Sequence, residues 1–378
     1  MDRESLAPVD RESLAPMDRV ARLEQVREAM VVAGCQALVV TKAENVRWLC
    51  GFTGSNRTLV LTQTNLTIIT DGRYEMQLTQ QLSQAGVQAE QVITREPAGP
   101  LAAAIGDAKV VGLESEAVTW AEQRRYAEWL ERVDLRPTQD LIEELRRVKD
   151  DGEIARLRMA GSIADQALTA VKPELGNGRS ERWIARALDG AMADLGADGV
   201  SFATIVASGP NSAKPHHAPS ERTIEPGDMV IIDFGAKVDG YGSDMTRSFL
   251  LGTPTAPQRS MFAAVERAQA RGVAGVRNGV SEREVDRICR DSLTEDGFGE
   301  AFIHGTGHGI GLEIHENPIL STRASGILRS GYVVTVEPGA YLPELGGIRI
   351  EDSVVVTCLL YTSPSPRDAT LSRMPSSA

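Results

Sequence analysis

Short apolar runs alternate with stretches of helical spacing along the first part of the chain. Between Arg19 and Ala33, apolar residues recur three or four positions apart, as on one face of an amphipathic helix. Short apolar runs bounded by polar turns are typical of buried strands. The pattern predicts helices at 19–33, 74–81 and 120–133 and strands at 37–41, 58–62, 66–70 and 110–113. This mixture indicates an α/β domain.

A polar segment at 148–152 separates this part from a strongly amphipathic helical stretch. The apolar face of that helix is expected to consist of Ile154, Leu157, Gly161, Ala164, Leu168 and Val171. Two domains are also the default for 378 residues, because one hydrophobic core rarely organises a chain of that length. We therefore expect a boundary near residue 150.

The second part of the chain carries two predicted strand pairs with acidic residues near their turns. The runs 229–235 and 243–249 flank the turn sequence Val238-Asp239-Gly240, which predicts an antiparallel hairpin with Asp233 and Asp244 close together.

The same arrangement recurs in the predicted strands 333–337 and 348–354, where Glu337 and Glu351 form a second acidic pair. Two acidic pairs on two hairpins predict an internally pseudo-symmetric antiparallel sheet that holds its site at the centre.

Composition and charge exclude several classes of protein. Hydrophobic residues make up 42% and charged residues 24%, as in ordinary globular proteins, and no apolar run approaches the length of a membrane span. The net charge of −12 disfavours nucleic acid, because its phosphates need a basic face. We expect neither a nucleic-acid nor a membrane partner.

A cytoplasmic location is expected from the cysteines and from the start of the chain. The cysteines have no CxxC spacing, which argues against a disulfide framework and against a thiolate zinc site. The first residues are charged where a signal peptide needs a hydrophobic stretch. Reduced thiols in a cytoplasm fit both observations.

Both ends of the chain differ from the rest in pattern. The sequence of residues 2–8 recurs at 10–16, so residues 1–16 are expected to be an extension, with Met17 as the natural start. Residues 358–378 are rich in Ser and Pro and show neither helical nor strand periodicity, which predicts a disordered or foreign tail.

All five histidines of the chain fall between residues 216 and 315, among the acidic residues named above. They are densest in the segment 304–316, where glycines let the backbone come close to a ligand and imidazoles supply nitrogen donors. This segment has neither GxGxxG spacing nor a P-loop lysine, so a phosphate cradle is rejected.

Electrostatics gives the physical reason to expect a metal site. Four carboxylates gathered on largely apolar strands would repel one another and be poorly solvated, which raises their pKa values or requires counter-cations. Two divalent cations would neutralise them. Oxygen-rich ligation with a single imidazole favours Mn, Co, Fe or Zn. Water between two such ions becomes a nucleophile near neutral pH, so the predicted chemistry is hydrolysis.

Taken singly, the same residues also fit structural roles. Asp233 and Asp244 flank a turn, where an aspartate usually caps the backbone. Glu337 precedes Pro338-Gly339 and could simply end a strand, and Arg349 could form an ordinary ion pair. His217 is expected to be a solvated loop residue. Only the combination of residue types in this order favours a metal site.

The chain resembles the creatinase and proline-peptidase family of pita-bread metallopeptidases, M24, in its aminopeptidase P and Xaa-Pro dipeptidase branch. The run from His304 to Glu316 matches the family's proline-peptidase pattern. The family's five metal ligands correspond in order to Asp233, Asp244, His308, Glu337 and Glu351. In the first part, Asn45 and the segments 51–55 and 71–74 also match, so the resemblance spans about 17–357.

This resemblance implies a creatinase-type α/β amino-terminal domain at 17–148. It implies an α+β pita-bread catalytic domain at 149–357, with a pseudo-two-fold antiparallel sheet. Relatives continue past Glu351 through a finished strand and a short helix, whereas the likeness here stops near Thr357. The catalytic domain is therefore expected to be truncated, with Glu351 on a poorly braced strand.

The resemblance also implies metal-binding roles. Asp233 would chelate one metal, Asp244 and Glu351 would bridge both, and His308 and Glu337 would complete the other. Glu337 would also accept the proton of the attacking water.

The remaining family positions would serve the substrate and the ligands. His216 and His315 would line the substrate site and stabilise the tetrahedral intermediate. His304 would support the ligands from behind, and Arg349 would orient Glu351 or meet the substrate.

The resemblance thus predicts a proline-directed metallo-exopeptidase with two divalent ions, Mn foremost. It would hydrolyse the Xaa-Pro bond of peptides with proline in the second position, as a dipeptidase or an aminopeptidase. The alternative is a metal-poor relative that acts as a peptide- or protein-binding module, against which the complete ligand set argues. Creatinase-like hydrolysis without metal is disfavoured for the same reason. A homodimer is expected because homodimers are common among relatives.

Overall fold

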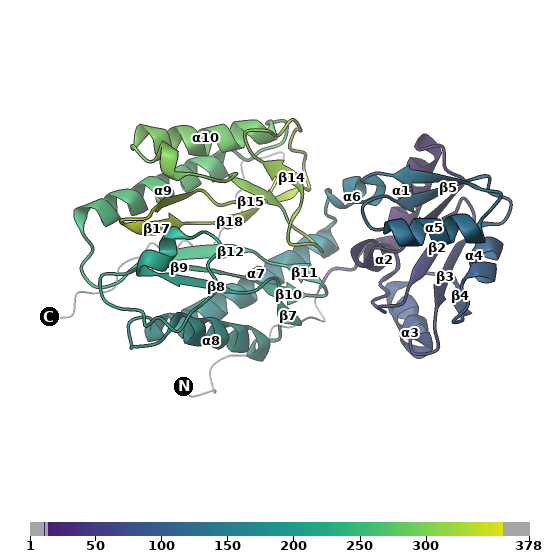
Figure 1. Cartoon of the computed structure of the whole chain (residues 1–378), viewed down its shortest axis with the longest axis horizontal. Coiled ribbons are helices and arrows are strands. Elements are labelled where there is room, and N and C mark those ends of the chain that lie inside the picture. The colour runs from purple at the N-terminus through teal and green to yellow at the C-terminus, as the bar shows by residue number, and fades with distance from the viewer. Residues whose placement is uncertain (1–10, 12–13, 358–378) are drawn as a thin grey trace. The chain divides into compact units, whose positions relative to one another are not determined.

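The computed structural model of the chain describes Arg11 and residues 14–357. These residues form two compact units, one from Pro16 to Arg146 and one that begins at Arg147 (Figure 1). The described residues of the repeat that precede Pro16 belong to the second unit. The tail expected at 358–378 lies outside the described residues, as does most of the repeat at 1–16.

The first unit is an α/β domain around one mixed sheet. Its helices are α1 (Arg19–Val32), α2 (Ala43–Cys50), α3 (Glu75–Ala85), α4 (Ala98–Ile105), α5 (Trp120–Trp129) and α6 (Leu141–Arg146). Its strands are β1 (Ala37–Val40), β2 (Thr58–Thr62), β3 (Leu66–Thr70), β4 (Glu90–Ile93), β5 (Val110–Glu114) and β6 (Asp134–Thr138). The strand order is β4-β3-β2-β1-β5-β6, with β1 parallel to β5 and antiparallel to β2.

Every strand and helix predicted for this unit is confirmed, with ends that differ by a few residues. The elements that the pattern did not predict are short: α2, α4, α6, β4 and β6. Strand β6 contains Pro137, which cannot donate to a ladder and is tolerated because β6 is an edge strand. Segments this short contain too few residues to show a helical or strand periodicity, so they are not recognised from sequence.

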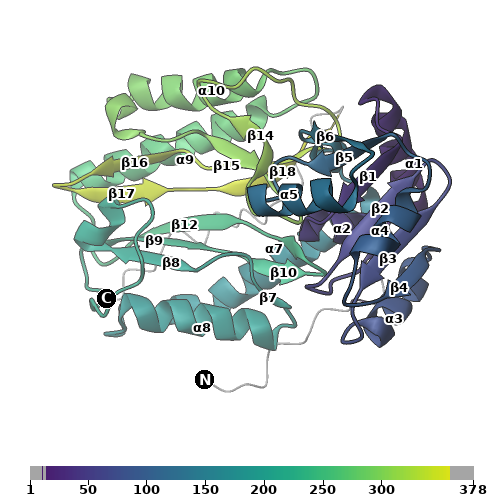
Figure 2. The ribbon, with the colours of Figure 1, turned by 45° about the vertical axis from the view of Figure 1, so that its right-hand side comes forward.

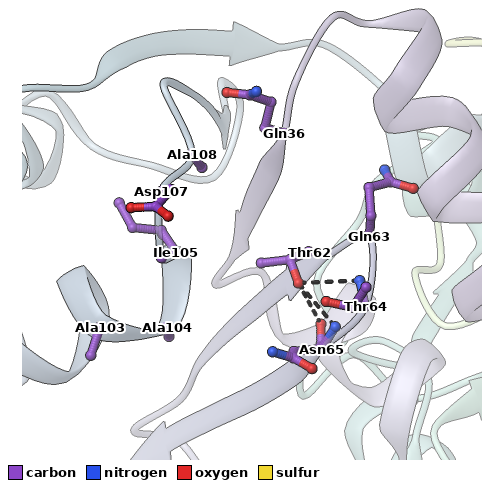
Figure 3. Close-up of a pocket in the computed structure, with 11 residues that line it drawn as sticks. Gln36, Thr62, Gln63, Thr64, Asn65, Ala103, Ala104, Ile105, Asp107 and Ala108 are labelled. Carbon is purple, nitrogen blue, oxygen red and sulfur yellow. Dashed lines mark hydrogen bonds between the residues drawn. The ribbon is translucent and has the colours of Figure 1, made fainter.

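A pocket of about 370 Å³ lies at one end of this sheet, between the turn at 62–65 and the segment 103–108 (Figure 3). The hydroxyl of Thr62 accepts hydrogen bonds from the backbone N–H groups of Thr64 and Asn65, and Gln36 Oε1 accepts from Lys109 N. The polar groups of the pocket that make these bonds therefore serve the local backbone, and none of the predicted site residues lines it.

The second unit contains two helix pairs that cover strands. Its helices are α7 (Asp151–Val171), α8 (Glu181–Asp194), α9 (Ala256–Gly275) and α10 (Glu282–Glu295), with short 3-10 turns η2 (Lys172–Glu174), η3 (Gly209–Ala213) and η4 (Gly299–Ala301). Its first strands are β7 (Gly199–Val200), β8 (Ile205–Ser208), β9 (Met229–Phe234), β10 (Ala236–Val238), β11 (Tyr241–Gly242) and β12 (Met245–Leu250). Its later strands are β13 (Gly307–Gly309), β14 (Glu316–Leu320), β15 (Val333–Val336), β16 (Gly339–Leu342), β17 (Gly346–Arg349) and β18 (Asp352–Val355).

These elements form two similar halves. Helices α7 and α8 share one hydrophobic core with β9, β10 and β12, whereas α9 and α10 share another with β15, β16 and β17. Both views show α9 and α10 on one side of the strands and α8 on the other (Figures 1 and 2). The expected pita-bread architecture, with helices outside a pseudo-symmetric antiparallel sheet, is therefore confirmed.

The predicted apolar face of α7 is wrong in part. Ile154, Leu157, Gly161 and Leu168 are only half-buried, and the buried face is Gly152, Glu153, Met159, Ala160, Ile163, Ala164, Ala167 and Val171. Much of this face is small alanine side chains, so α8 and β10 can come close to it. Apolar spacing located the helix correctly, but several of the residues that it selected lie at the margin of the packing.

The described residues contain no helix with the length and apolar character that a bilayer crossing requires. Cys35, Cys50 and Cys289 are buried and free.

Candidate metal centre

The first acidic pair lies on the β9–β12 hairpin. Asp233 is in β9, where its partner across the ladder is Thr246, and Asp244 directly precedes β12. The chain between them continues as the small β10–β11 hairpin. Its turn residues Asp239 and Gly240 both have positive φ, as a two-residue turn that matches strand twist requires. The predicted turn is therefore confirmed.

The second acidic pair lies where strands break. Glu337 follows β15, and Glu351 lies between β17 and β18, so the single strand predicted at 348–354 is wrong. The backbone N–H of Glu351 donates to Thr246 O at 3.2 Å, across to the other half of the unit. This crossing bond explains the break, because Glu351 leaves the β15 ladder to reach the centre.

The expectation of a poorly braced strand after Glu351 is wrong for the described residues. Strand β18 pairs with β15 along its whole length, from Asp352 opposite Val336 to Val355 opposite Val333.

His308 is in β13, between two glycines that the close packing requires. A Cβ on Gly307 would collide with the carbonyl oxygen of Thr335, and one on Gly309 would collide with that of Asn317. These glycines therefore let neighbouring strands approach β13, whereas the sequence suggested that they admit a ligand. The Thr335 hydroxyl also accepts from the His308 backbone N–H at 3.0 Å.

The structure brings the five predicted ligands together. His308 Nε2 lies 3.4 Å from Glu337 Oε1 and 3.5 Å from Asp244 Oδ2. One ligand atom each of Asp244, His308 and Glu351 lie within 4.8 Å of one another. Asp233 is close enough that its charge contributes to raising the pKa of Asp244, Glu337 and Glu351.

The imidazole of His308 presents a lone pair to these carboxylates. Its Nδ1 lies 3.0 Å from the carbonyl oxygen of Gly309, which can only accept, so Nδ1 carries the proton. Burial lowers the pKa of His308 to about 4, so the ring is neutral at neutral pH. When the carboxylates are ionised, Nε2 and the oxygens of Asp244 and Glu337 are all acceptors that face one another, an arrangement that a cation between them would stabilise.

The carboxylates point to the same conclusion. Burial, followed by mutual repulsion, raises the pKa of Asp244 and of Glu351 well above normal values, and burial raises that of Glu337 to about 8. Asp233 Oδ1 and Glu351 Oε1 are buried and have no hydrogen-bond partner. Orphaned carboxylate oxygens are costly in a protein interior unless a cation satisfies them. The donor set, oxygen-rich with one imidazole, fits hard or borderline divalent cations.

Arg349, at the end of β17, binds one of these carboxylates directly. Its Nη2 donates to Asp233 Oδ2 at 2.7 Å. Its Nε donates at 3.1 Å to the hydroxyl of Thr246, which in turn donates to Glu351 Oε2 at 2.7 Å. Arg349 therefore holds Asp233 directly and Glu351 through Thr246, whereas the sequence suggested Glu351 alone or the substrate.

Tyr341 joins Arg349 to His304 and was not predicted. Arg349 Nη1 donates to the Tyr341 hydroxyl at 2.8 Å, and His304 Nε2 lies 3.0 Å from that hydroxyl. His304 Nδ1 faces the Gly305 carbonyl at 2.8 Å, so Nδ1 is the donor and Nε2 accepts from Tyr341. The hairpin register held the missing signal: Gly339 opposes Arg349, so Tyr341, two residues on, lies on the same face.

His216 and His315 differ from the other predicted histidines because both are exposed. The His315 ring centroid is 4.4 Å from that of His308. The carbonyl of Pro215, which precedes His216, accepts from Arg349 Nη1 at 3.3 Å. The positive charge of a protonated His216 acts to lower the pKa of Asp233 and of His304. Both histidines therefore lie beside the acidic cluster, where a ligand from solvent can reach them.

His217 is not the solvated loop residue that the sequence suggested. Its side chain is mostly buried, and Nε2 lies 2.8 Å from Glu181 Oε2. Nothing adjacent to His217 in the sequence indicates this contact, because Glu181 is at the start of α8.

Comparisons with known proteins cover both units. Residues 22–148 match the creatinase/prolidase N-terminal domain, and residues 155–358 match metallopeptidase family M24. An uncharacterized peptidase, YqhT, of Bacillus subtilis is 39% identical over 342 residues, which are 89% of this chain and 95% of that protein.

Solved structures agree with these matches. A Xaa-Pro dipeptidase from Bacillus anthracis has a TM-score of 0.86 and 38% identity, covering 90% of this chain and 96% of that one. An X-Pro aminopeptidase from Thermotoga maritima has a TM-score of 0.80 and 34% identity, covering 87% of this chain and 95% of that one.

Proposed function

Because this chain belongs to metallopeptidase family M24 and carries a creatinase/prolidase N-terminal domain, we propose that it hydrolyses the Xaa-Pro bond of short peptides. One observation carries the proposal most directly: Asp233, Asp244, His308, Glu337 and Glu351 converge in one buried cluster with orphaned carboxylate oxygens. Structural relatives named as Xaa-Pro dipeptidase and X-Pro aminopeptidase support the substrate class.

We assign the five ligands to two divalent ions, with Mn as the first choice. Asp233 would bind one ion, and His308 and Glu337 would bind the other. Asp244 and Glu351 would bind both. Such ions, when bound, activate water and polarise the scissile carbonyl. The cluster of four carboxylates matches the positive charge of two divalent cations, which supports two ions rather than one.

The chain's own groups then have separate tasks. Glu337 accepts the proton that water releases as it attacks the carbonyl carbon. His216 and His315, exposed beside the cluster, donate hydrogen bonds to the oxygen that becomes negative in the tetrahedral intermediate. The neutral imidazole of His304 and the Tyr341 hydroxyl keep Arg349 against Asp233, so that carboxylate cannot rotate.

The alternative of a metal-poor binding module has no support. The proximity of Asp244, His308, Glu337 and Glu351, four of the five residues proposed as ligands, supports a metal-binding enzyme instead.

The deciding experiment is an assay of the Mn-loaded protein on a Xaa-Pro dipeptide and on a Xaa-Pro-Xaa tripeptide. Cleavage of the dipeptide alone identifies a dipeptidase, and release of the first residue from the tripeptide identifies an aminopeptidase. His308→Ala is the inactive control. Failure to cleave either peptide, with metal content verified on the same sample, contradicts the proposed function.

We also propose, from the family resemblance, that the protein is a homodimer. Light scattering at two protein concentrations gives the mass directly, and a value near the monomer's 40.7 kDa would contradict this.

A further inference from the structure

Glu181 is a buried carboxylate at the first position of α8, directly after the N-cap Ser180. Its side chain is fully buried, which is rare for a glutamate unless the charge is well paired. A glutamate in the first helical turn normally stays exposed and interacts with the helix dipole. Complete burial here therefore needs another explanation.

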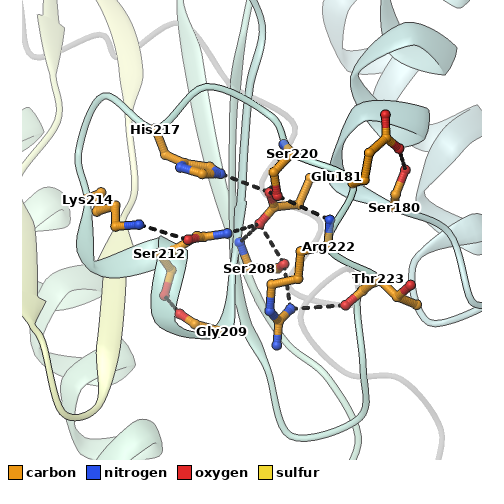
Figure 4. A network of polar contacts seen from close by, with 12 residues as sticks. Ser180, Glu181, Ser208, Gly209, Ser212, Lys214, His217, Ser220, Arg222 and Thr223 are labelled. Carbon is orange, nitrogen blue, oxygen red and sulfur yellow. Dashed lines mark hydrogen bonds and ion pairs between the residues drawn. The ribbon is translucent and has the colours of Figure 1, made fainter.

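The contacts of Glu181 explain its burial, because both carboxylate oxygens accept several hydrogen bonds (Figure 4). Oε1 accepts from the backbone N–H and hydroxyl of Ser208, both at 2.8 Å, and from Asn211 Nδ2 at 3.1 Å. Oε2 accepts from the backbone N–H of Ser220 at 3.0 Å, from its hydroxyl at 2.6 Å and from His217 Nε2 at 2.8 Å.

These partners lie at both ends of one segment, residues 208–220, which we term the His216 loop. Ser208 is the last residue of β8, and Ser220 closes the loop. Arg222 strengthens the first end, since its Nη1 donates to the Ser208 hydroxyl at 2.7 Å while the guanidinium also binds Asp228. Glu181 therefore joins the start and the end of the loop through a single carboxylate.

The middle of the His216 loop contacts the candidate metal centre. The carbonyl of Pro215 accepts from Arg349 Nη1, and the backbone N–H of Gly347 donates to the Ser212 hydroxyl at 2.8 Å. A Cβ on Gly347 would collide with the Ser212 carbonyl, so the loop lies directly against β17. His216 thus sits in a loop held by Arg349 and β17 on one side and by Glu181 on the other.

The hydrogen bonds to Glu181 keep its carboxylate ionised. Burial by itself would raise the pKa of Glu181, but hydrogen bonds from Ser220, Asn211, His217 and Ser208 outweigh it and lower the pKa to about 2. The group is ionised at neutral pH and accepts from every partner at once.

We propose that Glu181 is a positioning residue, whose carboxylate fixes both ends of the His216 loop and so directs His216 toward the substrate. This inference rests on the proposed peptidase function, because the position of His216 affects activity only if His216 contacts a peptide. The hydrogen bonds of Glu181 described above go to Ser208, Asn211, His217 and Ser220, none of which is a proposed metal ligand. Glu181 acts through the loop.

The other half of the unit offers a matched control. Helix α10 also begins with a glutamate after a serine N-cap, Glu282 after Ser281, and both serines bridge to a following loop. Glu282 accepts from the backbone N–H of Gly326 at 3.1 Å and is buried. Its loop carries none of the residues proposed for binding or chemistry. Glu282→Gln therefore removes the same charge at the same helix position, away from His216.

The first measurement is hydrogen exchange by mass spectrometry, which does not depend on activity. In Glu181→Gln, the amide nitrogen of glutamine cannot accept from its partners, so exchange in 208–220 should accelerate about tenfold or more. In Glu282→Gln the acceleration should be confined to the loop around Gly326. Unchanged exchange in 208–220 of Glu181→Gln would overturn the proposal.

The second measurement separates positioning from loss of stability. Glu181→Gln should lower kcat about 10- to 100-fold with KM changed less, because a misplaced catalytic group costs rate at unchanged binding. In a His216→Ala background the same substitution should have little further effect, since the loop then has no imidazole to position. An equal loss in both backgrounds, or a kcat within about twofold of the wild type, would contradict positioning.

A milder variant covers the case in which Glu181→Gln does not fold. His217→Ala removes one donor and leaves the carboxylate with its other partners, so kcat should fall by less than in Glu181→Gln, and exchange near 217–220 should rise. An unaltered exchange rate and kcat in this variant would count against the proposal. A wild-type protein that cleaves no Xaa-Pro peptide would instead contradict the proposed function, while exchange in 208–220 still decides whether Glu181 holds the loop.

Discussion

Arg349 Nη2 lies 2.7 Å from Asp233 Oδ2, while the other oxygen of the same carboxylate is buried without a hydrogen-bond partner. One carboxylate oxygen of Asp233 thus binds a fixed guanidinium, and the other is left for a cation. Because Arg349 also binds Tyr341 and Thr246, one side chain sets the position of ligands from both halves of the unit.

Replacement of Arg349 by lysine should weaken metal binding and activity, although the charge is kept. A lysine ammonium is a point donor and cannot reach Asp233, Tyr341 and Thr246 together. We expect a loss of about 10- to 100-fold in Mn affinity by calorimetry and in kcat/KM. Arg287→Lys, at an exposed arginine of α10, is the control and should leave both unchanged. Wild-type affinity in Arg349→Lys would show that Asp233 needs no orientation.

Removal of metal should lower the melting temperature. The carboxylates then face one another with the charge of Arg349 on Asp233 but without that of the ions, so the others must be protonated or repel one another. Mn at about 100 times its dissociation constant should stabilise the fold by about 2.7 kcal/mol, or about 5 to 10 °C in scanning calorimetry. His308→Ala should show a smaller response. If chelator leaves the wild-type melting curve in place, the ligands do not bind metal in the folded state.

The stability contributed by Glu181 should depend on pH in a defined direction. Its pKa is lowered from 4.5 to about 2 in the folded protein, so its contribution is complete above the unfolded value and is lost as pH falls through the folded one. We expect a difference between wild type and Glu181→Gln of up to about 3 kcal/mol at pH near 6, which shrinks toward pH near 2. Urea unfolding at several pH values measures it. A difference that grows on acidification would mean that the carboxylate is not stabilised in its charged form.

Lys149 and Glu316 form an ion pair that is almost completely buried, between the start of the second unit and β14. Loss of Lys149 removes an opposite charge from beside a buried carboxylate, so Lys149→Met should destabilise the protein by about 3 to 5 kcal/mol. The double variant Lys149→Met, Glu316→Gln should recover part of this in urea unfolding. The exposed pair of Arg271 with Glu295 provides the comparison, since Arg271→Met should cost less than about 1 kcal/mol. Similar costs at both sites would mean that burial adds nothing to the Lys149 pair.

Several features of the fold follow from local patterns in the sequence. The strands at 58–62 and 66–70 are found as predicted, because apolar runs bounded by turn residues specify strands over a few positions. The Asp239-Gly240 turn is similarly local, since positive φ at both residues needs no tertiary partner. The hairpin pattern was sufficient to pair Asp233 with Asp244 and Glu337 with Glu351, and the family resemblance added His308; the structure then brings these residues together.

Other features depend on contacts between distant segments. The buried face of α7 was misjudged because helical spacing does not say which apolar side a neighbour covers. The break at Glu351 follows from a hydrogen bond to Thr246, more than a hundred residues earlier, and no property of residues 348–354 reveals it. Tyr341 could be placed beside Arg349 only once the β16–β17 register was known.

The amino-acid sequence by itself determined which groups can bind metal, where the chain turns and which segments form helices and strands, because these depend on residue type and short-range geometry. Only the tertiary structure decided that Arg349 holds Asp233, that Tyr341 joins it to His304, and that Glu181 closes the His216 loop. The physical reason is that a buried charge selects partners by distance and desolvation, and folding alone decides which residues lie within reach.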